Sequence, residues 1–113
     1  TLKTILAENV VETVNAKAQA FFEEVGTIAA SASGNLFANS LGSMATLFFQ
    51  TGPVKNFQDA VRSDTERFTE FFGKMLDQGI YLAPSQFEAM FISLAQSDAD
   101  LEKTLQALKT ALR

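Results

Sequence analysis

The sequence contains no cysteine, no histidine and no tryptophan among its 113 residues. Without cysteine the chain has no disulfide, no thiolate nucleophile and no thiolate metal ligand. Without histidine, Ser-His-Asp and Cys-His catalytic arrangements are impossible, and so is a zinc site of the usual histidine or cysteine type. Catalysis by this chain alone would have to rest on carboxylates, lysines or the single tyrosine, Tyr81.

Positive charge and long hydrophobic runs are also scarce. The formal net charge is −4, which argues against a nucleic-acid partner because phosphate contacts need clustered Lys and Arg. No run of about eighteen apolar residues is present, so we expect no membrane-spanning helix. A composition that is 47% hydrophobic and 19% charged is typical of a globular protein, and the length predicts a single domain over residues 1–113.

The first third of the chain predicts two helices. Residues 2–7 carry a short apolar face, and Asn9 followed by Glu12 has the form of a capping box that starts a second helix. Apolar residues at three- and four-residue spacing carry this amphipathic helix to about Val25. Gly26 either ends the helix there or lies within a continuation through residues 27–30, and residues 31–35 have the composition of a loop.

The next segment predicts two strands, residues 36–41 and 44–50, around Gly42 and Ser43, or one long strand with a bulge at Gly42. The second strand is apolar on both faces. Because such a strand needs cover on both sides, we expect a neighbour from outside this chain.

The remaining segments alternate in the same way. Asn56 is expected to cap a helical turn, and a capping box at 63–66 starts a helix whose apolar stripe ends before Gly79. Strands are expected at 80–82 and 87–94, and Ser97 is expected to cap the last helix. The fold class is therefore α+β, with a small antiparallel or mixed sheet of about three strands and helices packed on one face.

The run Met75–Ala89, which reads MLDQGIYLAPSQFEA, resembles the C-terminal signature of the glutamate-1-semialdehyde 2,1-aminomutase family. Residues 63–68 and 91–95 fit the same pattern, and the resemblance is dense from about Gly42 to the C-terminus. The family belongs to the class III, fold-type I aminotransferase group, so the implied cofactor of the parent is pyridoxal phosphate or pyridoxamine phosphate.

The resemblance implies that this chain is the C-terminal small domain of a longer enzyme, with residues 1–8 the end of an interdomain helix. The implied parent is a homodimer in the cytoplasm or plastid stroma. It converts the small molecule glutamate-1-semialdehyde to 5-aminolevulinate for tetrapyrrole synthesis. The lysine that forms the Schiff base with the cofactor is implied to lie in an N-terminal large domain. We therefore expect no catalytic or cofactor-binding residue in this chain, and no activity from it alone.

Glu88 is the main candidate site residue. Glu88 is the single charged residue among the apolar neighbours Phe87, Ala89 and Met90. A side chain that faces solvent would account for a charge at this position. The resemblance implies instead that its carboxylate faces the substrate amino group, and we favour that interpretation. Ser85 and Gln86 are further candidates for substrate binding, although a Pro-Ser turn has structural uses for both.

Several other positions leave alternatives open. Residues 42–44 match a family segment near the substrate entrance, but a Gly-Ser hairpin turn explains them equally well. Met90 stands where the family usually has a small residue, and Gln96 stands where histidine is common, so both could alter specificity. A different hypothesis is a free-standing, non-enzymatic interaction module that docks through the apolar strand at 44–49. A further alternative is the small domain of another class III aminotransferase.

Overall fold

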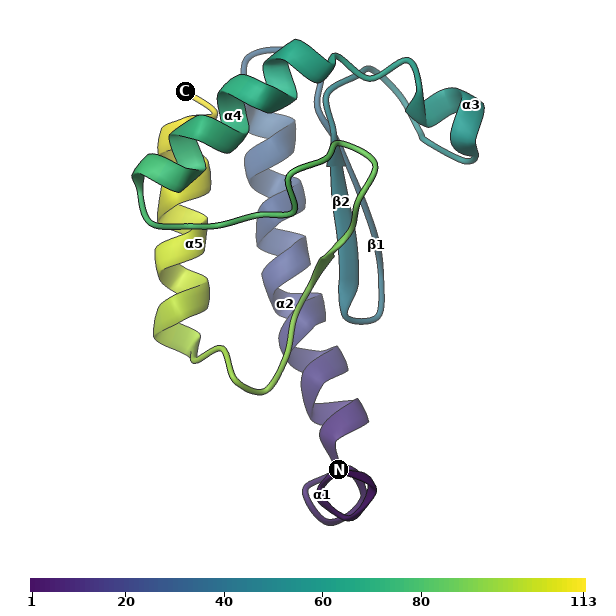
Figure 1. Ribbon diagram of the computed structural model, residues 1–113, viewed down its shortest axis with the longest axis vertical. Coiled ribbons are helices and arrows are strands. Elements are labelled where there is room, and N and C mark those ends of the chain that lie inside the picture. The colour runs from purple at the N-terminus through teal and green to yellow at the C-terminus, as the bar shows by residue number, and fades with distance from the viewer.

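A computed structural model describes all residues, Thr1–Arg113. Five helices and three strands follow in the order α1 (Leu2–Ala7), α2 (Val10–Ser31), β1 (Phe37–Leu41), β2 (Met44–Phe48), α3 (Phe57–Ala60), α4 (Thr65–Asp77), β3 (Met90–Phe91) and α5 (Asp98–Ala111). The strands form one antiparallel sheet in the order β1-β2-β3. The predicted α+β class with about three strands is confirmed (Figure 1).

One face of the sheet carries the main hydrophobic core. Along β2 and just past its end, Ala45, Leu47 and Phe49 point to this face and are buried against α2, α4 and α5. These three helices lie on the same side of the sheet, as predicted (Figure 1). The helices bury regular stripes, which include Phe21, Phe22 and Val25 of α2, Phe71 and Met75 of α4, and Leu101, Leu105 and Leu108 of α5.

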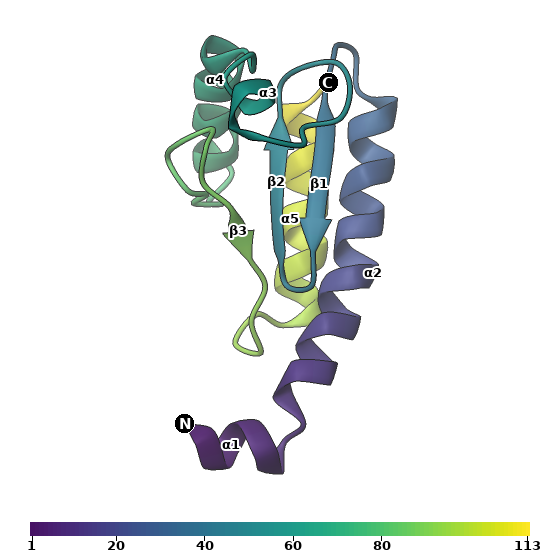
Figure 2. The same cartoon turned by 90° about the vertical axis from the view of Figure 1, so that its right-hand side faces the viewer.

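The other face of the sheet is covered only in part. Phe48 is buried against Val54 and Ala60, with Phe37 beside them, because the segment that ends in α3 folds over this side. Figure 2 shows this face, with α3 above and α5 behind the strands. The expectation that β2 lacks a neighbour on this side is therefore wrong for Phe48. It holds for Met44, which is 40% exposed.

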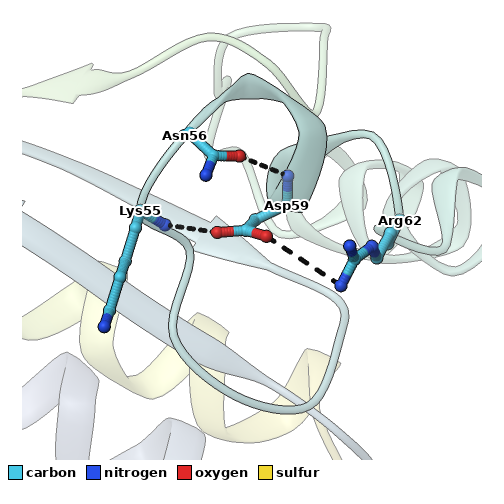
Figure 3. Close-up of polar contacts among 4 residues, drawn as sticks. All are labelled: Lys55, Asn56, Asp59 and Arg62. Carbon is cyan, nitrogen blue, oxygen red and sulfur yellow. Dashed lines mark hydrogen bonds and ion pairs between the residues drawn. The ribbon is translucent and has the colours of Figure 1, made fainter.

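Side-chain hydrogen bonds hold the single turn of α3 (Figure 3). Asn56 Oδ1 accepts a hydrogen bond from Asp59 N at 2.9 Å, which is the predicted cap. Asp59 Oδ2 in turn accepts from Lys55 N at 3.1 Å, and Asp59 Oδ1 lies 3.9 Å from Arg62 Nη1. These contacts let a four-residue helix cover Phe48.

Two predicted capping boxes are wrong. Asn9 precedes α2 with a left-handed backbone, φ 49°, and its side chain caps nothing, because it makes the sharp bend between α1 and α2. The N-cap of α4 is Asp64, whose Oδ1 accepts from Arg67 N at 3.0 Å. Ser63 is displaced from that role because its own N–H donates to Ala60 O in the turn that ends α3, and its hydroxyl is buried without a partner.

Two open alternatives are resolved by the structure. The helix continues through Gly26 to Ser31, because Val25, Ile28 and Ala29 all bury against the core. Gly42 lies in a hairpin turn between β1 and β2 with φ 56°, a conformation that glycine adopts without steric cost. The single bulged strand is therefore wrong.

The predicted strands at 80–82 and 87–94 are also wrong, apart from the two residues of β3. Met90 pairs with Ala45 and Phe91 with Met44, and Ile92 N donates to Ser43 O at 2.9 Å. Residues 80–82 pair with no strand. Beyond the β3 pairing, the side chain of Gln86, and no backbone segment, bonds to the edge of β2.

The predicted caps at the ends of α4 and α5 are confirmed. Gly79 follows α4 with φ 79°, as expected of a residue just past a helix end. Ser97 Oγ accepts from Asp100 N at 3.1 Å, and Asp100 Oδ2 accepts from Ser97 N at 2.8 Å, which completes a capping box. None of the helices combines the length and apolar character needed to cross a membrane.

The α5 cap makes a prediction about acid stability. Hydrogen bonds from Ser97 hold the pKa of Asp100 below its usual range. A carboxyl whose pKa is lower in the folded state stabilises the fold above its unfolded pKa of about 3.9 and loses this contribution as pH falls through the folded value. Asp100→Asn should therefore lower the free energy of unfolding at pH 7 and reduce its decrease between pH 7 and pH 3.

Urea unfolding at both pH values measures this effect. Asp98→Asn is the matched control, since Asp98 lies in the same first turn and has no hydrogen bond to Ser97. Equal acid sensitivity of Asp100→Asn and the unmodified chain would contradict the assignment.

Candidate functional site

The residues predicted as a site lie in a tight turn between the end of α4 and β3. Ser85 Oγ accepts a hydrogen bond from Phe87 N at 3.2 Å, and Ser85 O accepts from Glu88 N at 3.2 Å. Pro84 favours the extended backbone that leads into such a turn. The hydroxyl of Ser85 is therefore used within the Ser85–Glu88 turn itself.

Gln86 connects this turn to the interior of the domain. Its side chain is only 3% exposed. Gln86 Nε2 donates to Leu47 O at 2.6 Å, and Gln86 Oε1 accepts from Phe49 N at 3.3 Å. Both hydrogen-bonding groups of the carboxamide are thus engaged by the backbone at the end of β2.

Glu88 ends the turn and is exposed to solvent. Its backbone oxygen faces Thr46 Oγ1 at 3.4 Å, but no hydrogen bond or ion pair within the chain involves its carboxylate. The charge therefore carries no burial penalty in this domain. The carboxylate is free to meet a cationic group from outside the chain.

The space beneath the turn is nearly filled. A cavity of about 20 Å³ is room for roughly one water molecule at most. Its lining includes Leu82, Ser85, Glu88 and Met90. Met90 is half-buried and packs against the main core. Any group that contacts the Glu88 carboxylate must therefore approach from the solvent side.

Gln96 and the Gly42–Ser43 pair, which the sequence also singled out, have structural roles in loops. Gln96 Oε1 accepts from Ser93 N at 2.9 Å, and Gln96 O accepts from Lys17 Nζ, so this residue closes the loop before α5. Gly42 and Ser43 form the β1–β2 turn, and Ser43 O accepts from Ile92 N. Sequence reasoning did not identify Thr46, because only the fold brings its hydroxyl to the turn.

The residues of this chain do not fit a pyridoxal-phosphate site. Such a site needs a lysine for the Schiff base and an acidic partner for the pyridinium nitrogen. Lys17 bonds to Gln96 O, and Lys74 lies 2.7 Å from Glu70, whose pKa this hydrogen bond and charge lower. The remaining lysines, Lys3, Lys55, Lys103 and Lys109, are exposed. No group of acidic side chains is placed to hold a metal ion.

The curated proteins that this chain resembles in sequence share one name. Glutamate-1-semialdehyde 2,1-aminomutase of Desulfatibacillum aliphaticivorans is 42% identical over 113 residues, which cover 100% of this chain and 27% of the relative. The protein of that name from Chlorobaculum tepidum is 48% identical over 119 residues, 99% of this chain and 26% of the relative. One from Thermus thermophilus is 58% identical over 74 residues, 66% of this chain and 18% of the relative. The chain spans only about a quarter of such relatives, and no protein-family model matches it.

Solved structures share the fold at low sequence identity. A β-phenylalanine aminotransferase from Variovorax paradoxus matches with a TM-score of 0.78 and 20% identity, over 87% of this chain and 22% of that one. An omega-transaminase from Sphaerobacter thermophilus matches with a TM-score of 0.72 and 15% identity, over 90% and 23%. The same arrangement of helices and sheet therefore occurs within larger aminotransferase chains.

The burial of Gln86 makes a prediction about stability. Gln86→Met keeps the approximate length of the side chain but removes both hydrogen bonds, which leaves Leu47 O and Phe49 N unpaired. Since an unsatisfied buried polar group costs about 1–3 kcal/mol, we expect a loss of that order in the free energy of unfolding. Urea unfolding of this chain measures it.

The matched control is Ser85→Ala, which removes a hydrogen bond in the same turn from a half-buried side chain. Its bond to Phe87 N is exposed, so the expected loss is smaller. A Gln86→Met chain as stable as the unmodified one would show that water or a shifted backbone replaces the carboxamide.

Proposed function

Because the chain belongs to the glutamate-1-semialdehyde 2,1-aminomutase family as its C-terminal domain, we propose that it forms one wall of that enzyme's active-site cleft. The intact enzyme would convert glutamate-1-semialdehyde to 5-aminolevulinate. In this proposal the Glu88 carboxylate contacts the amino group of the substrate. The observation that carries it is an exposed carboxylate without a partner in the chain, on a turn fixed to the core.

The chemistry of the contact is electrostatic. A carboxylate and an ammonium group form a charge-assisted hydrogen bond, which is shorter and stronger than a bond between neutral groups. The carboxylate would hold the amino group in one orientation while pyridoxal phosphate, bound elsewhere in the intact enzyme, supplies the electron sink. Ser85 and Gln86 would support the turn and leave the contact to Glu88.

The rest of the intact enzyme would supply what this chain does not. Relatives are roughly four times as long, so we propose that a large N-terminal domain carries the Schiff-base lysine and the phosphate site. We also propose that α1 belongs to a helix between the two domains, since none of its residues is buried here. By this reasoning the chain alone is inactive. The homodimer and the location in the cytoplasm or plastid stroma belong to the same proposal and follow the family resemblance.

An open face on this domain supports contact with the remainder of the enzyme. We define the open face as two groups of exposed apolar residues, Leu41, Met44 and Phe91 on the sheet and Phe57 with Phe87 beside α3. Leu41 is 76% exposed and Phe91 is 61% exposed, and both pair with Met44 on the sheet side away from the main core. The rings of Phe57 and Phe87 lie 6.3 Å apart, and both are at least half exposed. Exposed hydrophobic patches of this kind mark interaction surfaces.

The alternative of a free-standing module that docks through residues 44–49 has less support. Ala45, Leu47 and Phe49 are buried in the main core, and Phe48 is buried under α3. Only Met44 and part of Thr46 remain accessible on this strand. The open face involves other segments as well, which suits a domain interface better than a single docking strand.

The decisive test is Glu88→Gln in the intact enzyme. This substitution keeps the shape of the side chain and removes its charge. A hydrogen bond to a charged group contributes roughly 1.5–3 kcal/mol, so kcat/KM should fall about ten- to a hundredfold. Thermal unfolding should change little, because the carboxylate is on an exposed residue and makes no hydrogen bond or ion pair within the chain.

An unchanged kcat/KM would return Glu88 to the role of a surface residue. A large loss of stability with normal kinetics would instead identify it as a structural ion-pair member in the intact enzyme. Thr69→Val, a substitution on the exposed side of α4, controls for the effect of any surface change.

The open face makes a second prediction for the isolated chain. It should bind an environment-sensitive dye such as ANS, and the double variant Leu41→Lys with Phe91→Lys should reduce the fluorescence markedly. Gln106→Lys, on the exposed side of α5, adds positive charge elsewhere and should leave the signal unchanged. Equal fluorescence from the double variant and the unmodified chain would contradict this use of the open face.

A further inference from the structure

Gln86 and Glu88 lie two residues apart with opposite surroundings. The Gln86 side chain is 3% exposed and bonds to Leu47 O and Phe49 N, whereas the Glu88 side chain is exposed and unbonded. In this turn, Gln86 is therefore anchored inside the domain, and the charged side chain of Glu88 lies at the surface. The backbone from Gln86 to Glu88 joins the two.

Few other hydrogen bonds fix the position of this backbone, although Leu82 before the turn and Met90 after it pack against the main core. Residues 80–82 pair with no strand, and the β2–β3 ladder begins only at Met90. Within the turn, Ser85 bonds to Phe87 N and Glu88 N, which sets its local shape but not its placement on the domain. The Thr46 hydroxyl lies 3.4 Å from Glu88 O, at the long end for an O–H···O hydrogen bond.

The Gln86 carboxamide makes the connection that a strand residue would make. Along one edge of an extended strand, the C=O of residue i and the N–H of residue i+2 point the same way, and a single residue of a parallel neighbouring strand bonds to both. Leu47 O and Phe49 N are such a pair, and Gln86 engages both with its side chain. The carboxamide thus fixes the turn to the edge of β2 through two hydrogen bonds.

We propose that Gln86 is a positioning residue for Glu88. In this role its carboxamide sets where the Glu88 carboxylate stands relative to a ligand cation, and Gln86 itself touches no substrate. The inference rests on the proposed function, because it requires that Glu88 contacts the substrate. It assigns Gln86 a role different from the direct substrate binding that its sequence position suggested.

A double-mutant cycle in the intact enzyme tests the coupling. Contacting or mechanically linked residues show non-additive effects, whereas independent residues add. Gln86→Met should lower kcat/KM about tenfold, since a displacement of even 1 Å can cost that much or more. In a Glu88→Gln background the same Gln86→Met change should alter kcat/KM less than twofold.

Hydrogen exchange provides a readout that does not depend on activity. In Gln86→Met, the amides of Phe87 and Glu88 should exchange about tenfold or more faster than in the unmodified enzyme, a difference expected when a local anchor is lost. Gln78→Met is the matched control. Gln78 Nε2 also bonds to two backbone oxygens, Lys74 O at 3.0 Å and Ala107 O at 3.2 Å, but it joins α4 to α5. Its substitution should leave both exchange at the turn and kcat/KM unchanged.

Each outcome has a definite meaning. Equal fold losses from Gln86→Met in both backgrounds would overturn the inference, as would normal kinetics in Gln86→Met. Unchanged kcat/KM in Glu88→Gln alone would refute the proposed function. If Gln86→Met still lowered kcat/KM in that case, its effect would not pass through Glu88 and the inference would fail as well. Should Gln86→Met not fold, Gln86→Asn keeps the amide but shortens its reach, and the same cycle and exchange measurements apply to it.

Discussion

The carboxamide of Gln86 makes the hydrogen bonds that a neighbouring strand would otherwise make at the edge of β2. Leu47 O and Phe49 N face that edge, and both are too deeply placed to be solvated well. Without a partner each would cost about 1–3 kcal/mol. Because a side chain satisfies them, the backbone of residues 85–88 does not have to run alongside β2. It can fold into a turn, and the turn can expose Glu88.

The two faces of the sheet are covered to different extents. Helices α2, α4 and α5 share one core with Leu47 and Phe49, while the opposite face has only α3, a helix of four residues. That helix reaches Phe48 but not Met44, and the two-residue β3 adds the exposed Phe91 to the same side. A domain that finishes one core and leaves the other half-covered has the arrangement expected of a part of a larger protein. Its relatives, about four times as long, agree with this view.

Sequence reasoning succeeded where the signal was local. The stripe in α4 and the Ser97 capping box depend on residues three or four apart. The capping box is confirmed, and the stripe is confirmed at Phe71 and Met75 but not at Leu76, which is 48% exposed. It failed at Asn9, Ser63 and residues 87–94. Asn9 adopts a left-handed backbone, Ser63 lies in the turn that ends α3, and residues 87–94 follow a turn held by a distant side chain. The position of Ser63 depends on how α3 ends, and the shortness of β3 depends on a side chain that bonds to β2 from 39 residues away. The exposure of Glu88 follows from that long-range bond, so pattern alone left its role open.

Because the Glu88 carboxylate is exposed in this domain, the strength of a contact with a substrate would depend on two conditions, the exclusion of water and a fixed geometry. An exposed carboxylate that meets an ammonium group in water gains only about 0–1 kcal/mol, because solvent screens the charges and the side chains lose mobility. A contact worth roughly 1.5–3 kcal/mol requires that water be excluded and that the geometry be fixed in advance. This domain supplies the second condition through the anchored turn, but its 20 Å³ cavity beneath Glu88 cannot supply the first. In the proposed function, the exclusion of water would have to come from the rest of the enzyme. For this reason the carboxylate, unpartnered in the domain, acquires its proposed role only in the assembled active site.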